Sequence, residues 1–119
     1  MFSHIMLGVD DLESGKRFYD ALLGQLGIAP GVTNKKRFAY RSPTGMFVIT
    51  IPLNGAAATA GNGSTTGFAA QSPEQVNAAH AAGLAAGGVA IEDAPGWRGE
   101  GPGALYLAYL RDPAGNKIC

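Results

Sequence analysis

Imidazole and thiol side chains, which can bind a metal ion or act in acid-base chemistry near neutral pH, are scarce in this sequence of 119 residues. The chain has two histidines, His4 and His80, and one cysteine, Cys119. A neutral imidazole is a common metal ligand and can act as a general base near neutral pH. No Cys-x-x-Cys pair and no Gly-x-Ser-x-Gly nucleophile turn occurs. The chemistry open to this chain therefore depends on a few isolated residues.

The two histidines stand in different local patterns. His4 lies in an apolar stretch, residues 2–9, which stops at two aspartates and is expected to be a strand. His80 lies on the apolar side of a predicted helix and is expected to bond to the backbone. From residue type alone, both histidines are expected to be structural side chains with hydrogen-bond partners.

The segment EDAPGWRGEGPG, residues 92–103, places Trp97 and Arg98 among glycines and prolines. Exposing a tryptophan side chain to water is unfavourable, so Trp97 is expected to pack against a ligand or against another protein surface. Arg98 could pair with an anionic ligand or with a nearby carboxylate. Two interpretations stay open, namely a lid over a ligand and a loop whose tryptophan packs on the core or in a dimer contact.

A second glycine-rich segment, GNGSTTG at residues 61–67, does not match a phosphate-binding loop. It lacks a following Gly-Lys pair and opens no predicted helix. Nine Lys and Arg residues balance nine Asp and Glu residues, so nucleic acid is not an expected partner. No apolar run approaches the roughly 20 residues that span a bilayer. The acidic N-terminal region and the single cysteine favour a cytoplasmic location.

The spacing of apolar residues predicts the elements of the first half. Phe18, Leu22 and Leu26 share one helical face, so residues 13–27 are expected to form a helix. Asp10 or Asp11 is expected to cap that helix. Two strands, residues 36–42 and 46–52, flank the sequence SPTG, which is typical of a tight turn.

The second half repeats this plan after a linker of small residues, 54–63. A strand at residues 64–71 precedes a helix at 73–88, with Ser72 as its N-cap and Pro73 in its first turn. A strand at 104–110 and a short one at 116–119 follow, joined by RDPAG. RDPAG matches the earlier RSPTG in the placing of Arg, Pro and Gly, which indicates a duplicated unit.

Three stretches carry a resemblance to a known family: HIMLGVDDLESGKRFYDALLGQLG, GNGSTTGFAA and RDPAGNKIC. Together they resemble the vicinal oxygen chelate superfamily of glyoxalase I, bleomycin-resistance proteins and extradiol dioxygenases. The resemblance implies an α+β fold in which two βαβββ modules curl mixed sheets around a concave cavity. It implies one domain, with modules at about 1–53 and 64–119 and the linker at 54–63. The resemblance implies a homodimer, since members of this family often form dimers, and the open sheet edges of such modules also favour one.

The resemblance also implies four metal-binding positions, which fall on His4, Ile49, Thr65 and Cys119. Only His4 is a good ligand, because Ile49 has no donor atom and Thr65 offers a neutral hydroxyl. Cys119 would suit a soft metal such as zinc or copper. We therefore expect no bound cofactor, and His4 is only a weak metal candidate.

A divalent metal stays open as an alternative, through ligands outside those four positions. The carboxylates of Glu92, Asp93 and Glu100 in the long loop are the candidates.

The expected function is binding of a small molecule in the concave cavity, with no bond broken. The expected ligand-binding residues are His4, Trp97, Arg98, Phe47 and Tyr106, and no catalytic residue is assigned. One alternative is a metal-dependent enzyme, either a lyase or isomerase like lactoylglutathione lyase or a dioxygenase. Another is an interaction module without a ligand.

Overall fold

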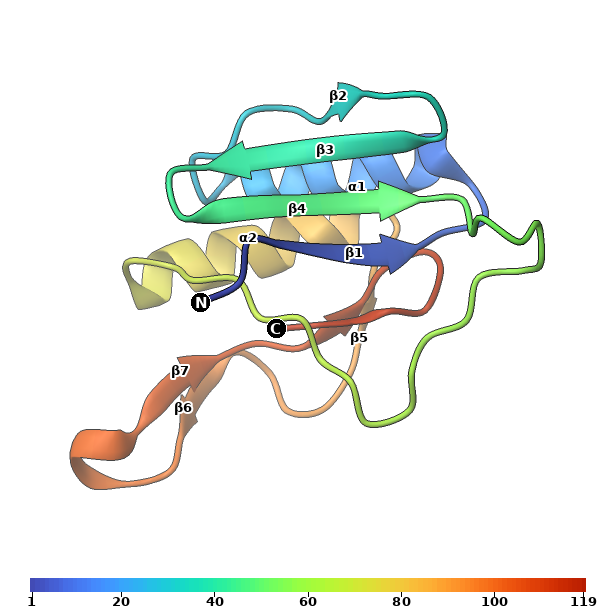
Figure 1. The fold of residues 1–119 in the computed structure, drawn as a ribbon. Helices are drawn as coiled ribbons and strands as arrows, with labels where there is room; N and C mark the ends of the chain where they lie inside the picture. Colours follow the sequence, from blue (N-terminus) through green and yellow to red (C-terminus); the bar gives the residue numbers. More distant parts are fainter.

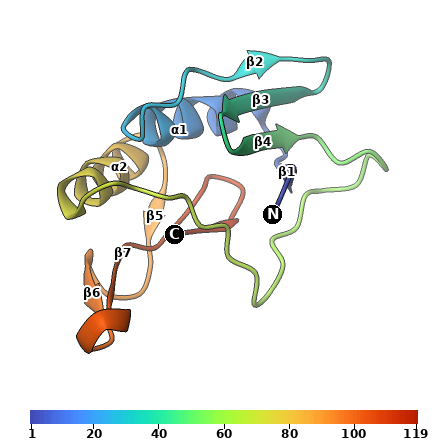
Figure 2. The ribbon, with the colours of Figure 1, turned by 60° about the vertical axis from the view of Figure 1, so that its left-hand side comes forward.

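The computed structural model describes residues 1–119. Helices α1 (Leu12–Gly24) and α2 (Pro73–Ala85) pack against each other on one side of the strands (Figures 1 and 2). None of its helices has the length and apolar character needed to cross a membrane. The strands are β1 (His4–Gly8), β2 (Val32–Thr33), β3 (Arg37–Ser42), β4 (Gly45–Thr50), β5 (Val89–Ala90), β6 (Gly96–Arg98), β7 (Leu105–Leu107), β8 (Leu110–Arg111) and β9 (Lys117–Ile118).

The first half forms a mixed sheet of four strands in the order β1-β4-β3-β2. β1 runs parallel to β4, and the other neighbours are antiparallel. The predicted turn joins β3 to β4, and Ser42 pairs with Gly45 across it.

The second half repeats that order with shorter strands. β5, β8 and β9 form an antiparallel sheet, and Thr66 pairs with Ile118 in parallel beside β9. The Thr66 amide donates to the Lys117 carbonyl at 3.0 Å, and the Phe68 amide donates to the Cys119 carbonyl at 2.8 Å. Residues 66–68 therefore stand beside β9 as β1 stands beside β4. The predicted α+β class with two βαβββ modules is confirmed.

Side-chain caps fix where both helices begin. The Asp11 carboxylate accepts hydrogen bonds from the amides of Glu13 and Ser14, at 3.0 and 3.2 Å. Ser72 Oγ accepts from the Gln75 amide at 3.1 Å. Of the two candidate caps for α1, Asp11 is therefore the one used. Asp10 instead accepts from the Ala58 amide at 2.7 Å, and so holds the linker.

The core lies between the two helices and the sheets. Its centre is Tyr19, whose ring packs 4.9 Å from Phe18 and 4.7 Å from Phe47, measured between ring centroids. Tyr19 has no exposed surface, and its hydroxyl donates to Asp112 Oδ2 at 2.7 Å. Further core residues are Val9, Leu22, Leu23, Phe38, Tyr40, Ile49, Ala79, Leu110 and Ile118.

The predicted strand at residues 104–110 is divided into β7 and β8. β7 pairs with β6 in a hairpin, closed by a short 3-10 helix at Gly101–Gly103, that extends away from the helices (Figure 1). β5 pairs with β8 and β6 with β7, and the ladder is interrupted between the two pairs, where Glu92 has a positive φ of 57° and Pro95 has no amide hydrogen. We call residues 96–107 the arm.

Candidate functional site

The side chains of the first sheet alternate between two faces. Ile5 pairs with Phe47. Phe47 is part of the core on the side of α1, and Ile5 packs against that core. One residue earlier, His4 pairs with Met46, which in turn pairs with Arg41. Since successive side chains of a strand point to opposite faces, these three share the face away from α1.

His4 is the side chain of this row that could act as a base. It is the first residue of β1 and is exposed. Its Nδ1 lies 2.9 Å from Ser3 Oγ, and no protein atom hydrogen-bonds its Nε2. One ring nitrogen is therefore positioned by a neighbour and the other is available, which is the arrangement a ligand-binding imidazole needs.

A pocket of about 440 Å³ opens beside His4, where the two halves of the chain meet. Phe47 and Phe68 supply apolar surface from the core side of the sheet, and His4 and Arg41 supply polar groups from the opposite face, so the pocket reaches round the end of the sheet. Other lining residues are Met1, Phe2, Ile5, Leu26, Ile28, Tyr40, Ser42, Thr44, Gly45, Met46, Thr66, Gly67 and Ala69. A largely apolar hollow with a few polar groups is typical of small-molecule sites. We call it the His4 pocket.

The predicted placing of Ile49 on the same face as His4 is wrong. Ile49 has no exposed surface, and its Cδ1 lies toward Gly15 of α1. Ile49 and Cys119 each lie four residues after the glycine of their turn, Gly45 and Gly115, but the two turns differ in length. Two residues separate the paired Ser42 and Gly45, whereas three separate Asp112 and Asn116, whose backbones are hydrogen-bonded at 2.9 Å. The residue of β4 that matches Cys119 is therefore Val48, which also lacks a donor atom.

The residues of this chain do not fit a divalent metal ion. No three side chains of His, Cys, Asp or Glu come together anywhere in the structure. Around His4, the same row carries a thioether at Met46 and a cation at Arg41. Arg41 lies two strands from His4, with Met46 between them, and its positive charge offers nothing to a metal ion on this face. A metal site would need carboxylates that this face of the sheet does not supply.

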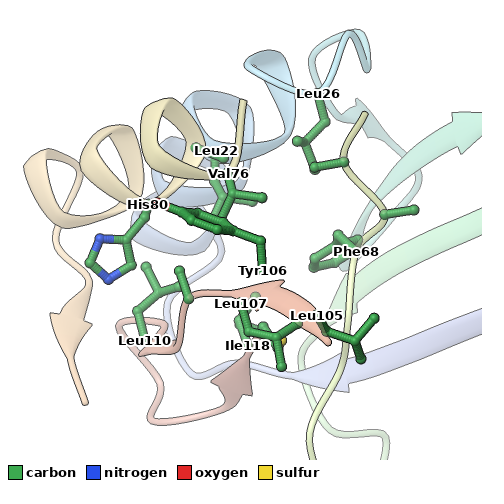
Figure 3. Close-up of a pocket in the computed structure, with 15 residues that line it drawn as sticks. Leu22, Leu26, Phe68, Val76, His80, Leu105, Tyr106, Leu107, Leu110 and Ile118 are labelled. Atoms are coloured by element: carbon green, nitrogen blue, oxygen red, sulfur yellow. The ribbon is translucent and has the colours of Figure 1, made fainter. Parts of the chain in front are cut away.

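A second pocket, of about 260 Å³, lies between the helices and the second half of the chain. Leu26, just after α1, Val76 from α2 and Phe68 turn toward the same space (Figure 3). Tyr106 also lines it and donates its hydroxyl to Asn77 Oδ1 at 2.9 Å. His80 stands at its side with Nε2 3.3 Å from the Tyr109 carbonyl oxygen, so the expected bond to the backbone is present.

Trp97 and Arg98 lie on the arm and line neither pocket. Trp97 is 65% exposed and packs edge-to-face on Tyr106, with ring centroids 5.5 Å apart. The interpretation in which Trp97 packs on the core of its own chain is therefore wrong. Arg98 Nη2 donates to the carbonyls of Asp93 and Ala94 at 3.0 and 2.9 Å, and so holds the loop before β6.

The structure thus brings together two of the five predicted ligand-binding residues. His4 and Phe47 line one pocket, Tyr106 lines the other, and Trp97 and Arg98 lie apart from both. Sequence reasoning did not select Arg41, which lines the His4 pocket. The sequence did contain a signal for it: Arg41 directly precedes the tight turn SPTG, and a hairpin closed by that turn pairs Arg41 with Met46.

The comparison with protein families identifies this chain. The model of the Glyoxalase/Bleomycin resistance protein/Dioxygenase superfamily matches residues 1–119. The chain therefore belongs to that superfamily, as the resemblance in its sequence predicted. Among proteins with curated descriptions, no match was found.

Solved structures support the same placement. A glyoxalase/bleomycin resistance protein from Albidiferax ferrireducens T118 is 68% identical, with a TM-score of 0.97, over 100% of this chain and 96% of that chain. A glyoxalase-related enzyme from Fulvimarina pelagi is 25% identical, with a TM-score of 0.71, over 99% and 86% of the two chains. A lactoylglutathione lyase from Agrobacterium tumefaciens is 20% identical, with a TM-score of 0.67, over 99% and 90%, and this likeness shows the fold alone.

Proposed function

We propose that this protein binds a small organic molecule with an anionic group in the His4 pocket, without a metal ion and without breaking a bond. The observation that carries this proposal is the row His4–Met46–Arg41 at the rim of a largely apolar hollow. His4 Nε2 and the Arg41 guanidinium offer hydrogen bonds to an anion. Phe47 and Phe68 offer apolar surface to the rest of the ligand.

The charges of this row support an anion over a cation. A carboxylate or phosphate group can accept a bidentate bond from a guanidinium, whereas a divalent metal would be repelled by it. The pocket volume of about 440 Å³ is in the range that holds a drug-sized molecule. Sequestration requires only this fit, so it needs no catalytic base or metal.

The test is a thermal-shift screen of aromatic and aliphatic carboxylates and phosphate monoesters. A ligand at one hundred times its dissociation constant should stabilise the protein by about 2.7 kcal/mol. His4→Ala and Arg41→Gln should each reduce the shift of a hit. Arg17→Gln, which removes the same charge from α1 and leaves the pocket intact, should not.

Two other functions correspond to other outcomes of that screen. A hit that stabilises the protein only with an added divalent ion would favour a metal-dependent lyase, isomerase or dioxygenase. A panel without any hit would favour an interaction module.

We also propose that the protein is a homodimer in which a second copy covers the arm. Trp97 and Leu105 are 65% and 60% exposed, and both lie on this hairpin. They leave opposite faces of the hairpin, since Trp97 pairs with Tyr106 and Leu105 pairs with Arg98, and exposed apolar side chains of this size favour burial against another surface. The superfamily's frequent use of dimers makes a second copy the simplest partner. The cytoplasmic location expected from the sequence stays a prediction.

A further inference from the structure

Two positive side chains lie next to each other on neighbouring strands of the second sheet. Arg111 of β8 and Lys117 of β9 are paired residues, so their side chains leave the same face of the sheet next to each other. Like charges placed opposite each other in this way are destabilising. One carboxylate is close, since Glu92 Oε2 lies 2.7 Å from Lys117 Nζ. Arg111 Nη1 donates only to the neutral Gly115 carbonyl, at 2.8 Å. One of the two positive charges therefore has no counter-charge.

A glycine-rich turn lies against this pair of cations. Residues 60–65, with Arg111 and Lys117, line a pocket of about 350 Å³ that shares no residue with the His4 pocket. The Ser64 amide and Ser64 Oγ both donate to the Gly61 carbonyl, at 3.2 and 2.8 Å, and Gly63 has a φ of 92°. The amides of Asn62, Gly63 and Thr65 make no hydrogen bond within the chain.

The fold brings positive side chains to this turn, although the sequence next to the turn has none. GNGSTTG does not match a phosphate-binding loop because no lysine follows its glycines. The sheet nevertheless places Arg111 and Lys117, some fifty residues later, beside the same turn. Unbonded loop amides and an uncompensated guanidinium are the groups that bind oxyanions in proteins.

We propose that this pocket is a binding site for a tetrahedral oxyanion, either free phosphate or the phosphate group of a small ester. Arg111 gives the bidentate contact, Lys117 adds a second charge, and amides of the turn complete the site. The site is separate from the His4 pocket, so it does not depend on the proposed function.

The test is a titration of the 15N-labelled protein with sodium phosphate at constant ionic strength, read from the amide NMR shifts. We expect saturable shifts at Asn62, Gly63 and Thr65. Arg111→Gln should weaken phosphate about tenfold, the loss expected for one charge-assisted hydrogen bond. Arg37→Gln makes the same charge change on the first sheet and should leave the dissociation constant unchanged. Lys117→Gln is the second variant, in case Arg111→Gln fails to fold.

The outcomes separate this site from the first one. Phenyl phosphate binding more tightly than inorganic phosphate would identify an ester as the ligand, and equal affinities would identify the free ion. His4→Ala should not alter phosphate binding. Shifts that do not saturate, that spread over the whole surface, or that are the same in the Arg111→Gln and Arg37→Gln variants would overturn the proposal.

Discussion

The carboxylate of Asp112 shows how a single residue can join distant parts of this chain. It is 2% exposed and accepts hydrogen bonds from the Tyr19 hydroxyl, the Ala114 and Asn116 amides and the Asn116 side chain, at 2.7 to 2.9 Å. Asn116 Nδ2 also donates to the Gly8 carbonyl at 3.0 Å. The second turn is therefore fastened to both α1 and β1. Burial and the Asp112 charge raise the pKa of Tyr19, so the hydroxyl stays protonated and remains the donor of this hydrogen bond.

Replacing Asp112 by Ala should therefore be strongly destabilising. It leaves a buried hydroxyl and two amides without their acceptor, and we expect a loss of about 3 kcal/mol in the free energy of unfolding. Urea denaturation followed by circular dichroism measures this. Asp93→Ala removes an exposed carboxylate and should change the stability by less than about 0.5 kcal/mol. Equal effects of the two substitutions would contradict the role given to Asp112.

The Asp20 carboxylate makes the stability of the folded protein depend on pH. Partial burial acts to raise its pKa, but hydrogen bonds from Lys16, the Gly31 amide and Tyr40 outweigh burial and hold the pKa of this carboxyl below its usual value. A carboxyl with a lowered pKa in the folded state contributes stability that is fully present above its ordinary value of about 4. That contribution is lost as the pH falls through the folded-state pKa.

The prediction is a difference between two pH profiles of the unfolding free energy. The wild type should lose more stability than Asp20→Asn as the pH falls below about 4, because the variant has no proton to bind at this site. Denaturation series at several pH values measure it. Parallel profiles would show that Asp20 does not contribute in this way.

At the scale of elements, the contact between the two helices depends on a small residue. Gly83 of α2 is buried, and a Cβ built on it would lie 2.7 Å from Leu110 Cδ1 and 3.1 Å from Leu22 Cδ1. Ordinary contacts between carbon atoms need about 3.5 Å or more. Glycine at this position therefore lets α2 lie close to Leu22 of α1 and Leu110 of β8 without displacing either side chain.

Gly83→Ala should therefore destabilise the protein by about 1–3 kcal/mol, although alanine favours helix. Gly24→Ala at the end of α1 is the matched control, because no atom lies within 4 Å of the added Cβ. It should be neutral or stabilising by up to about 1 kcal/mol. Thermal unfolding of both variants gives the comparison, and a stabilised Gly83→Ala would refute the close approach.

Most elements could be predicted because local signals specify them. Asp11, Ser72 and Pro73 mark the helix starts, and the turn SPTG marks the hairpin of β3 and β4. The face on which Ile49 lies could not be predicted from spacing, because one residue more or less in a turn reverses it. The environment of Trp97 depends on how β6 pairs with β7, and no local signal reports that pairing. Arg111 and Lys117 meet only through the sheet register.

At the scale of the whole molecule, the arm explains the elongated shape. The principal extents are 46, 29 and 29 Å, and the hairpin of β6 and β7 projects from the body (Figure 2). β7 is tied to α2 through Tyr106 and Asn77, but Trp97 on β6 stays exposed, which is unfavourable, and a hairpin alone is at best marginally stable. A second copy that covers it would remove this cost.

Light scattering after size-exclusion chromatography tests the dimer. The wild type should have the mass of two chains, and Trp97→Ser should shift the population toward the mass of one chain. Leu53→Ser alters another highly exposed apolar residue, 99% exposed and away from the arm, and should stay dimeric. A wild type with the mass of one chain would contradict the proposal.

The central claim is that the His4 pocket binds an anionic molecule without a metal. The measurement that tests it most directly is the thermal shift of a carboxylate or phosphate-ester hit, taken in a chelator and again with added zinc, nickel or manganese. We predict the same shift in both conditions, and its loss in His4→Ala. A shift that appears only with metal, or a stoichiometric metal content of the purified protein, would contradict the claim.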